Sequence, residues 1–132
     1  MIAVDSSALV AILEAEPDAA IYAKAIQEAE ALFVSAVTVL ETGIVIRARR
    51  GEAGLVRMWC FLVDDNDFQI VPFGKEHARE ALAAFASFGK GMQSQARLNL
   101  CDCAAYALAK SMNVPLLYKG NDFSQTDVRA AV

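Results

Sequence analysis

Cysteine and histidine are scarce in this sequence of 132 residues, which contains three cysteines and a single histidine, His77. The number of cysteines is odd, and Cys101 and Cys103 lie only two positions apart, so a disulfide framework is excluded and free thiols are expected. A structural zinc site needs four donors, and no further soft ligands accompany this pair. We therefore interpret the cysteines, including Cys60, as structural.

Long apolar runs are also absent, because no stretch reaches the roughly 18 uninterrupted apolar residues that a membrane span requires. Residues 1–13 are largely apolar, but they have no basic leader and Asp5 interrupts them, so they do not resemble a secretory signal. A cytoplasmic protein without membrane contact is expected. The hydrophobic content of 56% is enough for one compact core, and we expect a single domain over residues 1–132.

Positive charge is in deficit, since the formal net charge is −4 at pH 7. Lysine and arginine contacts dominate phosphate binding, so a broad basic surface for nucleic acid is excluded, although a nucleic-acid substrate is not. The basic residues gather locally at Arg47, Arg49, Arg50 and Arg57, and again at Lys90 and Arg97. A solvated helix face explains the first cluster equally well.

Short apolar segments alternate with helical patterns along the chain. The predicted strands are residues 2–4, 32–35, 68–71 and 115–118, and the predicted helices are residues 8–16, 17–30, 37–50, 52–63, 75–88 and 100–112. Ser6 and Ser7 are expected to cap the first helix, and Asn99 the last. This alternation implies right-handed crossovers and predicts an α/β fold, a three-layer α/β/α arrangement around a central parallel sheet of four to five short strands.

Four carboxylates lie where strand-like runs end or helices begin: Asp5, Glu41, Asp102 and Asp122. The carboxyl ends of parallel strands meet at one edge of a sheet, where open α/β folds bind ligands. Carboxylates gathered there repel one another and need protons or a cation. With so few soft ligands, that cation is expected to be Mg²⁺ or Mn²⁺ held by oxygen.

Each of these acids also has an ordinary structural explanation. Thr38 and Glu41 have the spacing of a capping box, and Asn99 and Asp102 repeat that spacing. Asp5 can cap the first helix and Asp122 can stabilise a turn. Four separate caps need not face one another, so a shared site and four structural roles both remain open at this point.

Four segments resemble PIN-domain ribonucleases, and most closely the VapC toxins of bacterial toxin–antitoxin pairs. The segments are AVDSSAL at 3–9, SAVTVLE at 35–41, LNLCDCAAYALA at 98–109 and LYKGNDF at 117–123. They span the whole chain in the family's order. The chain departs from the family at Cys101, where these toxins often carry glycine, and at Gln93 and Gln95, where histidine is frequent.

The resemblance implies a metal-dependent endoribonuclease with a catalytic and metal-binding quartet of Asp5, Glu41, Asp102 and Asp122. Among these, Asp5 and Asp102 are predicted to be inner ligands of Mg²⁺ or Mn²⁺, while Glu41 and Asp122 bind a second ion or orient water. The family also implies an RNA substrate, a small VapB-like antitoxin that occludes the site, and homodimers or larger assemblies.

Two supporting residues follow from the same resemblance. Ser7 matches the family's small polar residue beside the first aspartate, and Asp127 is expected to join the network at its edge.

Two other functions share individual features with this sequence. A phosphoaspartate-type phosphotransfer domain also places an aspartate after its first strand, but its dehalogenase form needs a second aspartate where Ser7 stands. A catalytically inactive PIN-like protein-binding module has no reason to keep four mutually repelling acids, which raise one another's pKa. His77, in the middle of a helical pattern, is expected to be a surface residue rather than a catalyst.

Overall fold

Four short parallel strands form one sheet in the computed structural model, which describes residues 1–132. The strands are β1 (Ile2–Val4), β2 (Leu32–Ser35), β3 (Gln69–Val71) and β4 (Leu116–Leu117), and their order in the sheet is β3-β2-β1-β4. Every residue of β2 is buried, as expected for a strand covered on both faces. The parallel α/β sheet predicted from the alternating pattern is confirmed.

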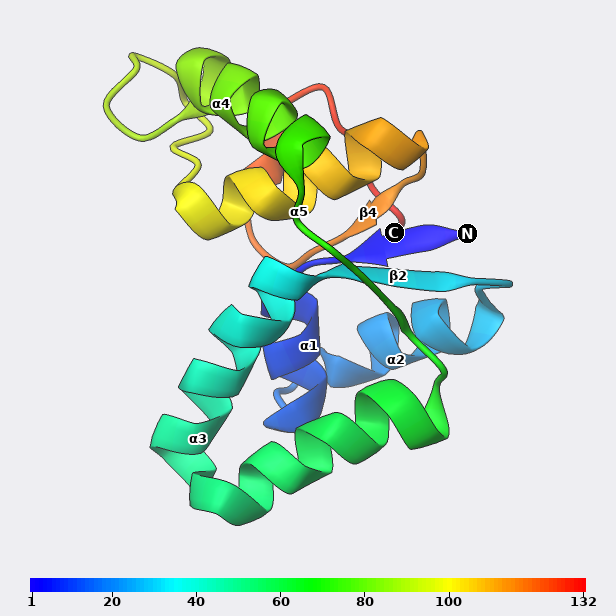
Figure 1. Cartoon of the computed structure of the whole chain (residues 1–132). Helices are drawn as coiled ribbons and strands as arrows, with labels where there is room; N and C mark the ends of the chain where they lie inside the picture. Colours follow the sequence, from blue (N-terminus) through cyan, green and yellow to red (C-terminus); the bar gives the residue numbers. More distant parts are fainter.

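Helices cover both faces of this sheet and complete three layers (Figure 1). On one side lie α1 (Ser6–Leu13), α2 (Ala19–Glu28) and α3 (Ala36–Trp59), and on the other lie α4 (Lys75–Phe88) and α5 (Leu100–Met112). Alternate strand residues enter two separate cores: Val4 and Val34 pack into one, and Ala3 and Phe33 into the other. No helix is long and apolar enough to cross a membrane.

The long helix α3 bends sharply at Gly51, where two helices were predicted to meet. Gly51 has φ 67° and ψ −161°, a conformation that residues with a side chain rarely adopt. Beyond the bend the helix runs to Trp59 and continues as the π-helical segment η1 (Cys60–Asp65). One glycine therefore turns the arginine-rich stretch back on itself.

Helix caps explain where prediction and structure differ. The first helix begins at Ser6, not Ala8, because Asp5 rather than either serine is its N-cap. The capping box expected from Thr38 to Glu41 is wrong: α3 starts at Ala36, and Ser35 caps it by accepting a hydrogen bond from the Val37 amide at 3.2 Å. The box at the start of α5 is confirmed, with Asn99 as N-cap.

The carboxyl ends of β1, β2 and β4 open at the same edge of the sheet because all the strands are parallel. The turns that follow them lead to Asp5, to the first turns of α3, and to the 3-10 helix η2 (Phe123–Gln125). Near the chain end only a single bridge, between Leu116 and Ala130, extends the pairing. The sheet thus has four strands, the lower of the two numbers expected.

Candidate active site

Asp5 is a buried carboxylate at the start of the first helix, with 2% of its surface exposed. Its Oδ2 accepts hydrogen bonds from the Ser7 amide at 3.0 Å and from the Ser7 hydroxyl at 2.6 Å. Its Oδ1 is buried without a partner. Burial raises the pKa of Asp5 to about 6; the Ser7 hydrogen bonds oppose that shift, and the charge of Glu41 adds to it.

Ser7 links this aspartate to the last strand of the sheet. While its hydroxyl donates to Asp5, its oxygen accepts a hydrogen bond from the Lys119 amide at 2.9 Å. The Lys119 ammonium in turn contacts Glu16 at 2.7 Å and Asp18 at 2.9 Å. The segment after β4 is therefore fixed against the start of α1, and the predicted supporting role of Ser7 has a structural basis.

Replacing Ser7 with alanine is expected to lower the free energy of unfolding by about 1–2 kcal/mol, since both Asp5 and the Lys119 amide lose a partner. Ser6→Ala is the matched control, because the Ser6 hydroxyl takes no part in this bridge. Urea unfolding of both variants measures the difference. Equal midpoints for the two variants would show that the bridge contributes nothing to stability.

Glu41 lies in the second turn of α3 and does not cap that helix. It is half-buried, and its Oε1 is enclosed without a hydrogen-bond partner. Its charge raises the pKa of Asp5. A carboxylate oxygen buried without a donor is costly unless a proton or a cation satisfies it, so Glu41 fits a ligand role better than the structural role suggested by its spacing from Thr38.

Asp102 lies in the first turn of α5 and is 9% exposed. Its Oδ2 accepts a hydrogen bond from the Asn99 amide at 3.0 Å, and Asn99 Oδ1 accepts one from the Asp102 amide at 2.8 Å. Burial raises the pKa of Asp102 to about 7; the charges of Asp5, Asp122 and Glu41 add to that shift, while the Asn99 amide opposes it. The pKa of Asp102 is therefore raised by the charges of the other three carboxylates.

Asp122 stands at the exposed start of η2, where its side chain makes no capping hydrogen bond. It borders an open hollow that no hydrophobic residue lines, together with Gln95, Arg97, Asn121, Ser124 and Gln125. Asp122 is therefore the solvent-exposed member of the quartet, whereas Asp5 and Asp102 are buried.

The four carboxylates thus interact electrostatically, although they come from four separate segments. In this structure no three His, Cys, Asp or Glu side chains are grouped closely enough to hold a metal ion. Asp5 and Asp102 each turn one oxygen toward a backbone amide of their own helix start. The ligand geometry stays a prediction.

The chemistry of the donors nevertheless fits a hard divalent cation. Asp5 Oδ1 and Glu41 Oε1 are both buried without hydrogen-bond partners. The neighbouring negative charges raise the pKa of Asp5 and of Asp102, so ionising these two carboxylates is costly. In proteins, such sets of carboxylate oxygens commonly coordinate a divalent cation, which neutralises their charge.

Cys101 also lies within reach of these charges, a position that the sequence interpretation missed. Burial raises the pKa of the Cys101 thiol to about 11, and the charges of Glu41, Asp102 and Asp5 add to that shift. Without a bound ion the thiol is therefore neutral at physiological pH. Its place next to Asp102 in the sequence was the available signal.

The structure does not bring Asp127 to the four carboxylates. Its Oδ1 accepts a hydrogen bond from the Tyr106 hydroxyl, and its Oδ2 pairs with Lys110 at 3.1 Å, one and two turns beyond Asp102 along α5. The Tyr106 hydrogen bond is the main cause of the lowered pKa of Asp127. His77 is likewise elsewhere: it is half-buried, 3.1 Å from the Ser111 hydroxyl near the other end of α5.

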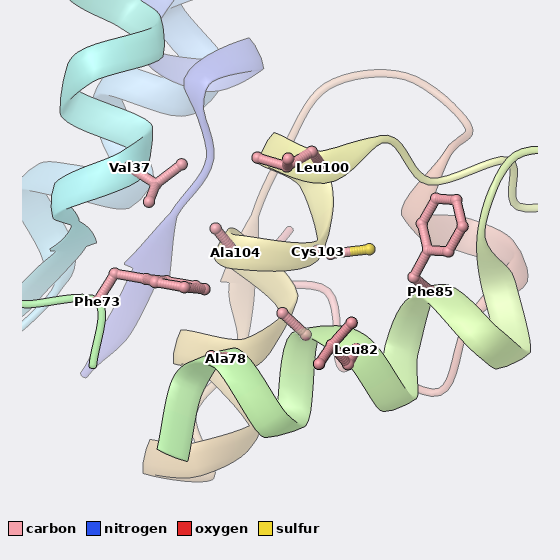
Figure 2. Close-up of a pocket in the computed structure, with 9 residues that line it drawn as sticks. Val37, Phe73, Ala78, Leu82, Phe85, Leu100, Cys103 and Ala104 are labelled. Atoms are coloured by element: carbon pink, nitrogen blue, oxygen red, sulfur yellow. The ribbon is translucent and has the colours of Figure 1, made fainter. Parts of the chain in front are cut away.

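An apolar hollow of about 490 Å³ lies beside the carboxylates, between α4, α5 and the start of α3. Figure 2 shows Val37, Phe73, Leu82, Phe85 and Leu100 around it. Its lining is entirely hydrophobic, so it offers neither oxygen ligands to a metal nor donors to a phosphate. This hollow is therefore not suited to hold a metal ion or a phosphate.

Comparison with known proteins adds family evidence to this geometry. Residues 2–129 match the model of the PIN domain. Among curated proteins, Ribonuclease VapC28 of Mycobacterium tuberculosis is 43% identical over 129 residues, which are 98% of this chain and 96% of that protein.

Solved structures share the fold at much lower sequence identity. Mycobacterium tuberculosis VapC20, described as a sarcin-ricin loop cleaving toxin, superposes with a TM-score of 0.79 at 13% identity, covering 97% of this chain and 96% of that one. A toxin-antitoxin complex from Klebsiella pneumoniae gives a TM-score of 0.70 at 16% identity, with 96% and 93% covered. At these identities the likeness is one of fold.

Proposed function

This chain belongs to the PIN domain family of VapC ribonucleases, and we propose that it is a metal-dependent endoribonuclease acting as the toxin of a toxin–antitoxin pair. The observation that carries the proposal is that Asp5 and Glu41 each hold a buried carboxylate oxygen without a hydrogen-bond partner. The pKa of the buried Asp102, which the charges of Asp5, Asp122 and Glu41 raise, supports it. The 43% identity to a curated VapC ribonuclease over nearly the full length of both chains supports the same activity. The two cores on either side of one sheet support a single domain over residues 1–132.

We assign Asp5 and Asp102 as inner ligands of Mg²⁺ or Mn²⁺, with Glu41 and Asp122 completing the set. When bound, such an ion would lower the pKa of the attacking water and offset the negative charge of the phosphate. The unpartnered oxygens of Asp5 and Glu41 support this assignment, because they can coordinate a metal ion and accept no hydrogen bond from the protein.

The protein's own residues then prepare the site. Ser7 fixes one oxygen of Asp5, and the Asn99 amide fixes one oxygen of Asp102, so each carboxylate is oriented before substrate arrives. Glu41 Oε1, which has no hydrogen-bond partner in the protein, is left to bind a second ion or to orient water. With His77 held near Ser111, carboxylates are the bases available here.

The partners follow from the same assignment. The substrate is RNA, and the cognate antitoxin is a VapB-like protein that covers the carboxylates; the toxin-antitoxin complex with the same fold supports that pairing. Homodimers or larger assemblies remain a prediction that sedimentation of the purified protein measures.

The proposed activity is tested by incubating RNA with the purified protein. We expect cleavage with Mg²⁺ or Mn²⁺, intact RNA with excess chelator, and renewed cleavage once the ion is restored, because charge on the phosphate must be countered. Gel electrophoresis of the RNA gives the readout. Equal cleavage with and without chelator would contradict the metal dependence, and intact RNA under all conditions would contradict the activity.

A further inference from the structure

Half of the basic side chains of this protein are paired with a neighbouring carboxylate. Six of the twelve lysines and arginines form ion pairs with carboxylates. Arg47 pairs with Glu52 at 2.7 Å, and Arg50 pairs with Glu14 at 2.9 Å. Arg49, which stands between them in the sequence, forms no ion pair, and neither does Arg97. These two arginines therefore retain free guanidinium groups.

Arg49 borders the carboxylate site from the side of α3. It lines a hollow whose residues are mostly polar, among them Ser7, Glu41, Glu16 and Lys119. Ser7 holds Asp5, and Glu41 belongs to the quartet, so a molecule seated in this hollow contacts both the free arginine and the edge of the site. Lys119 cannot replace it, because Glu16 and Asp18 already occupy the lysine's ammonium.

Arg97 borders the site at Asp122, in a second hollow that these two residues share. Its backbone is left-handed, with φ 56°, which is uncommon for a residue other than glycine. Both sequence neighbours, Ala96 and Leu98, are fully buried, and the Leu98 amide donates to the Phe88 carbonyl at 2.8 Å. The exposed guanidinium is thus presented from an anchored segment of the chain.

We infer that Arg49 and Arg97 bind the phosphates on either side of the scissile phosphodiester, so that an RNA strand crosses the carboxylates from α3 to the 89–97 loop. This inference rests on the proposed function. A cluster of four carboxylates repels a polyanion, and cations that neutralise the adjacent phosphates offset that repulsion. The planar guanidinium group matches phosphate oxygens in pairs. A strand with phosphates on both sides of the cleaved bond is therefore the preferred substrate class.

The test measures RNA binding in variants that lack Arg49 or Arg97. The probe is a fluorescein-labelled single-stranded RNA of about 20 nucleotides with random sequence. It is titrated in Mn²⁺ with protein that carries Asp102→Asn, because this substitution suppresses cleavage during the measurement. Arg49→Ala and Arg97→Ala are each expected to weaken binding about fivefold, and each to reduce the slope of log Kd against log salt by about 0.7, the value for one phosphate contact on a single strand.

Two arginines provide matched controls on the same helix as Arg49. Arg47→Ala removes a guanidinium that Glu52 already neutralises, and Arg57→Ala removes an exposed one that lines neither polar hollow. Both are expected to bind RNA like the parent. If Arg49→Ala and Arg97→Ala also bind like the parent while Mn²⁺-dependent cleavage by the wild-type chain is intact, the phosphate path is wrong and the proposed function stands. Absence of cleavage by the wild-type chain itself overturns the function.

Discussion

Asp102→Asn is expected to reduce metal-dependent RNA cleavage by about 10²- to 10³-fold, the usual effect of removing one group that stabilises the charge of a transition state. Asparagine keeps the shape of the side chain, and its carbonyl oxygen can still accept the hydrogen bond from the Asn99 amide that Asp102 accepts now. The negative charge is lost, so an inner ligand is weakened while the start of α5 is preserved. Initial rates of RNA cleavage in Mn²⁺ measure the effect, and thermal unfolding confirms that the variant is folded.

Asp127→Asn provides the matched control for this loss of charge. Asp127 contacts the same helix but pairs with Tyr106 and Lys110, away from the quartet. Its replacement is expected to leave the rate within about twofold of the parent, as for a partly exposed ion pair of small energetic value. If Asp102→Asn cleaves RNA as fast as the parent, or if Asp127→Asn loses as much activity, the assignment of the quartet is wrong.

Without divalent ions, the free energy of unfolding is expected to fall as the pH rises from about 5 to about 8. The folded-state pKa is about 6 for Asp5 and about 7 for Asp102, both above the ordinary value of 3.8. Raised pKa values mean that the folded protein holds more protons, so this stabilisation is complete below about pH 4 and is lost as the pH passes through 6 and 7. The whole titration of Asp5 is worth on the order of 3 kcal/mol, and roughly half of that loss falls between pH 5 and pH 8.

Mn²⁺ is expected to restore this stability at about pH 8 and to have little effect at about pH 5, where the two aspartates hold protons instead. Urea unfolding at both pH values, with chelator or with Mn²⁺, measures the difference. Asp5→Asn should be more stable than the parent at the higher pH in chelator and should respond less to Mn²⁺. A parent protein that gains equal stability from Mn²⁺ at both pH values would contradict the linkage between the ion and these protons.

The sequence predicts the fold well wherever a helix start or an apolar strand carries its own local signal. Both α4 and α5 have the predicted bounds, and Asn99 caps α5 as expected. The start of α3 was missed because Ser35 and Thr38 are both competent caps by residue type. The choice depends on which residue ends the extended backbone of β2, and that is set by pairing between strands.

The candidate site is less visible in the sequence, because proximity in space depends on the packing of whole elements. Parallel topology predicts that acids after separate strands lie at one edge of the sheet, and the charges of three of them raise the pKa of Asp102. Their convergence on one ion stays a prediction. Topology could not show that Asp127 is occupied by Tyr106 and Lys110. It also could not separate Arg49 from its paired neighbours, since ion pairs depend on side-chain positions that spacing does not encode.

The location of Mn²⁺ in crystals of the wild-type protein, found from its anomalous scattering, tests the shared carboxylate site most directly. We expect a peak between the carboxylates of Asp5 and Asp102, within about 2.0–2.6 Å of an oxygen from each, as is usual for hard divalent cations. A peak bound to neither aspartate, in crystals where Mn²⁺ is present in excess, would contradict the account.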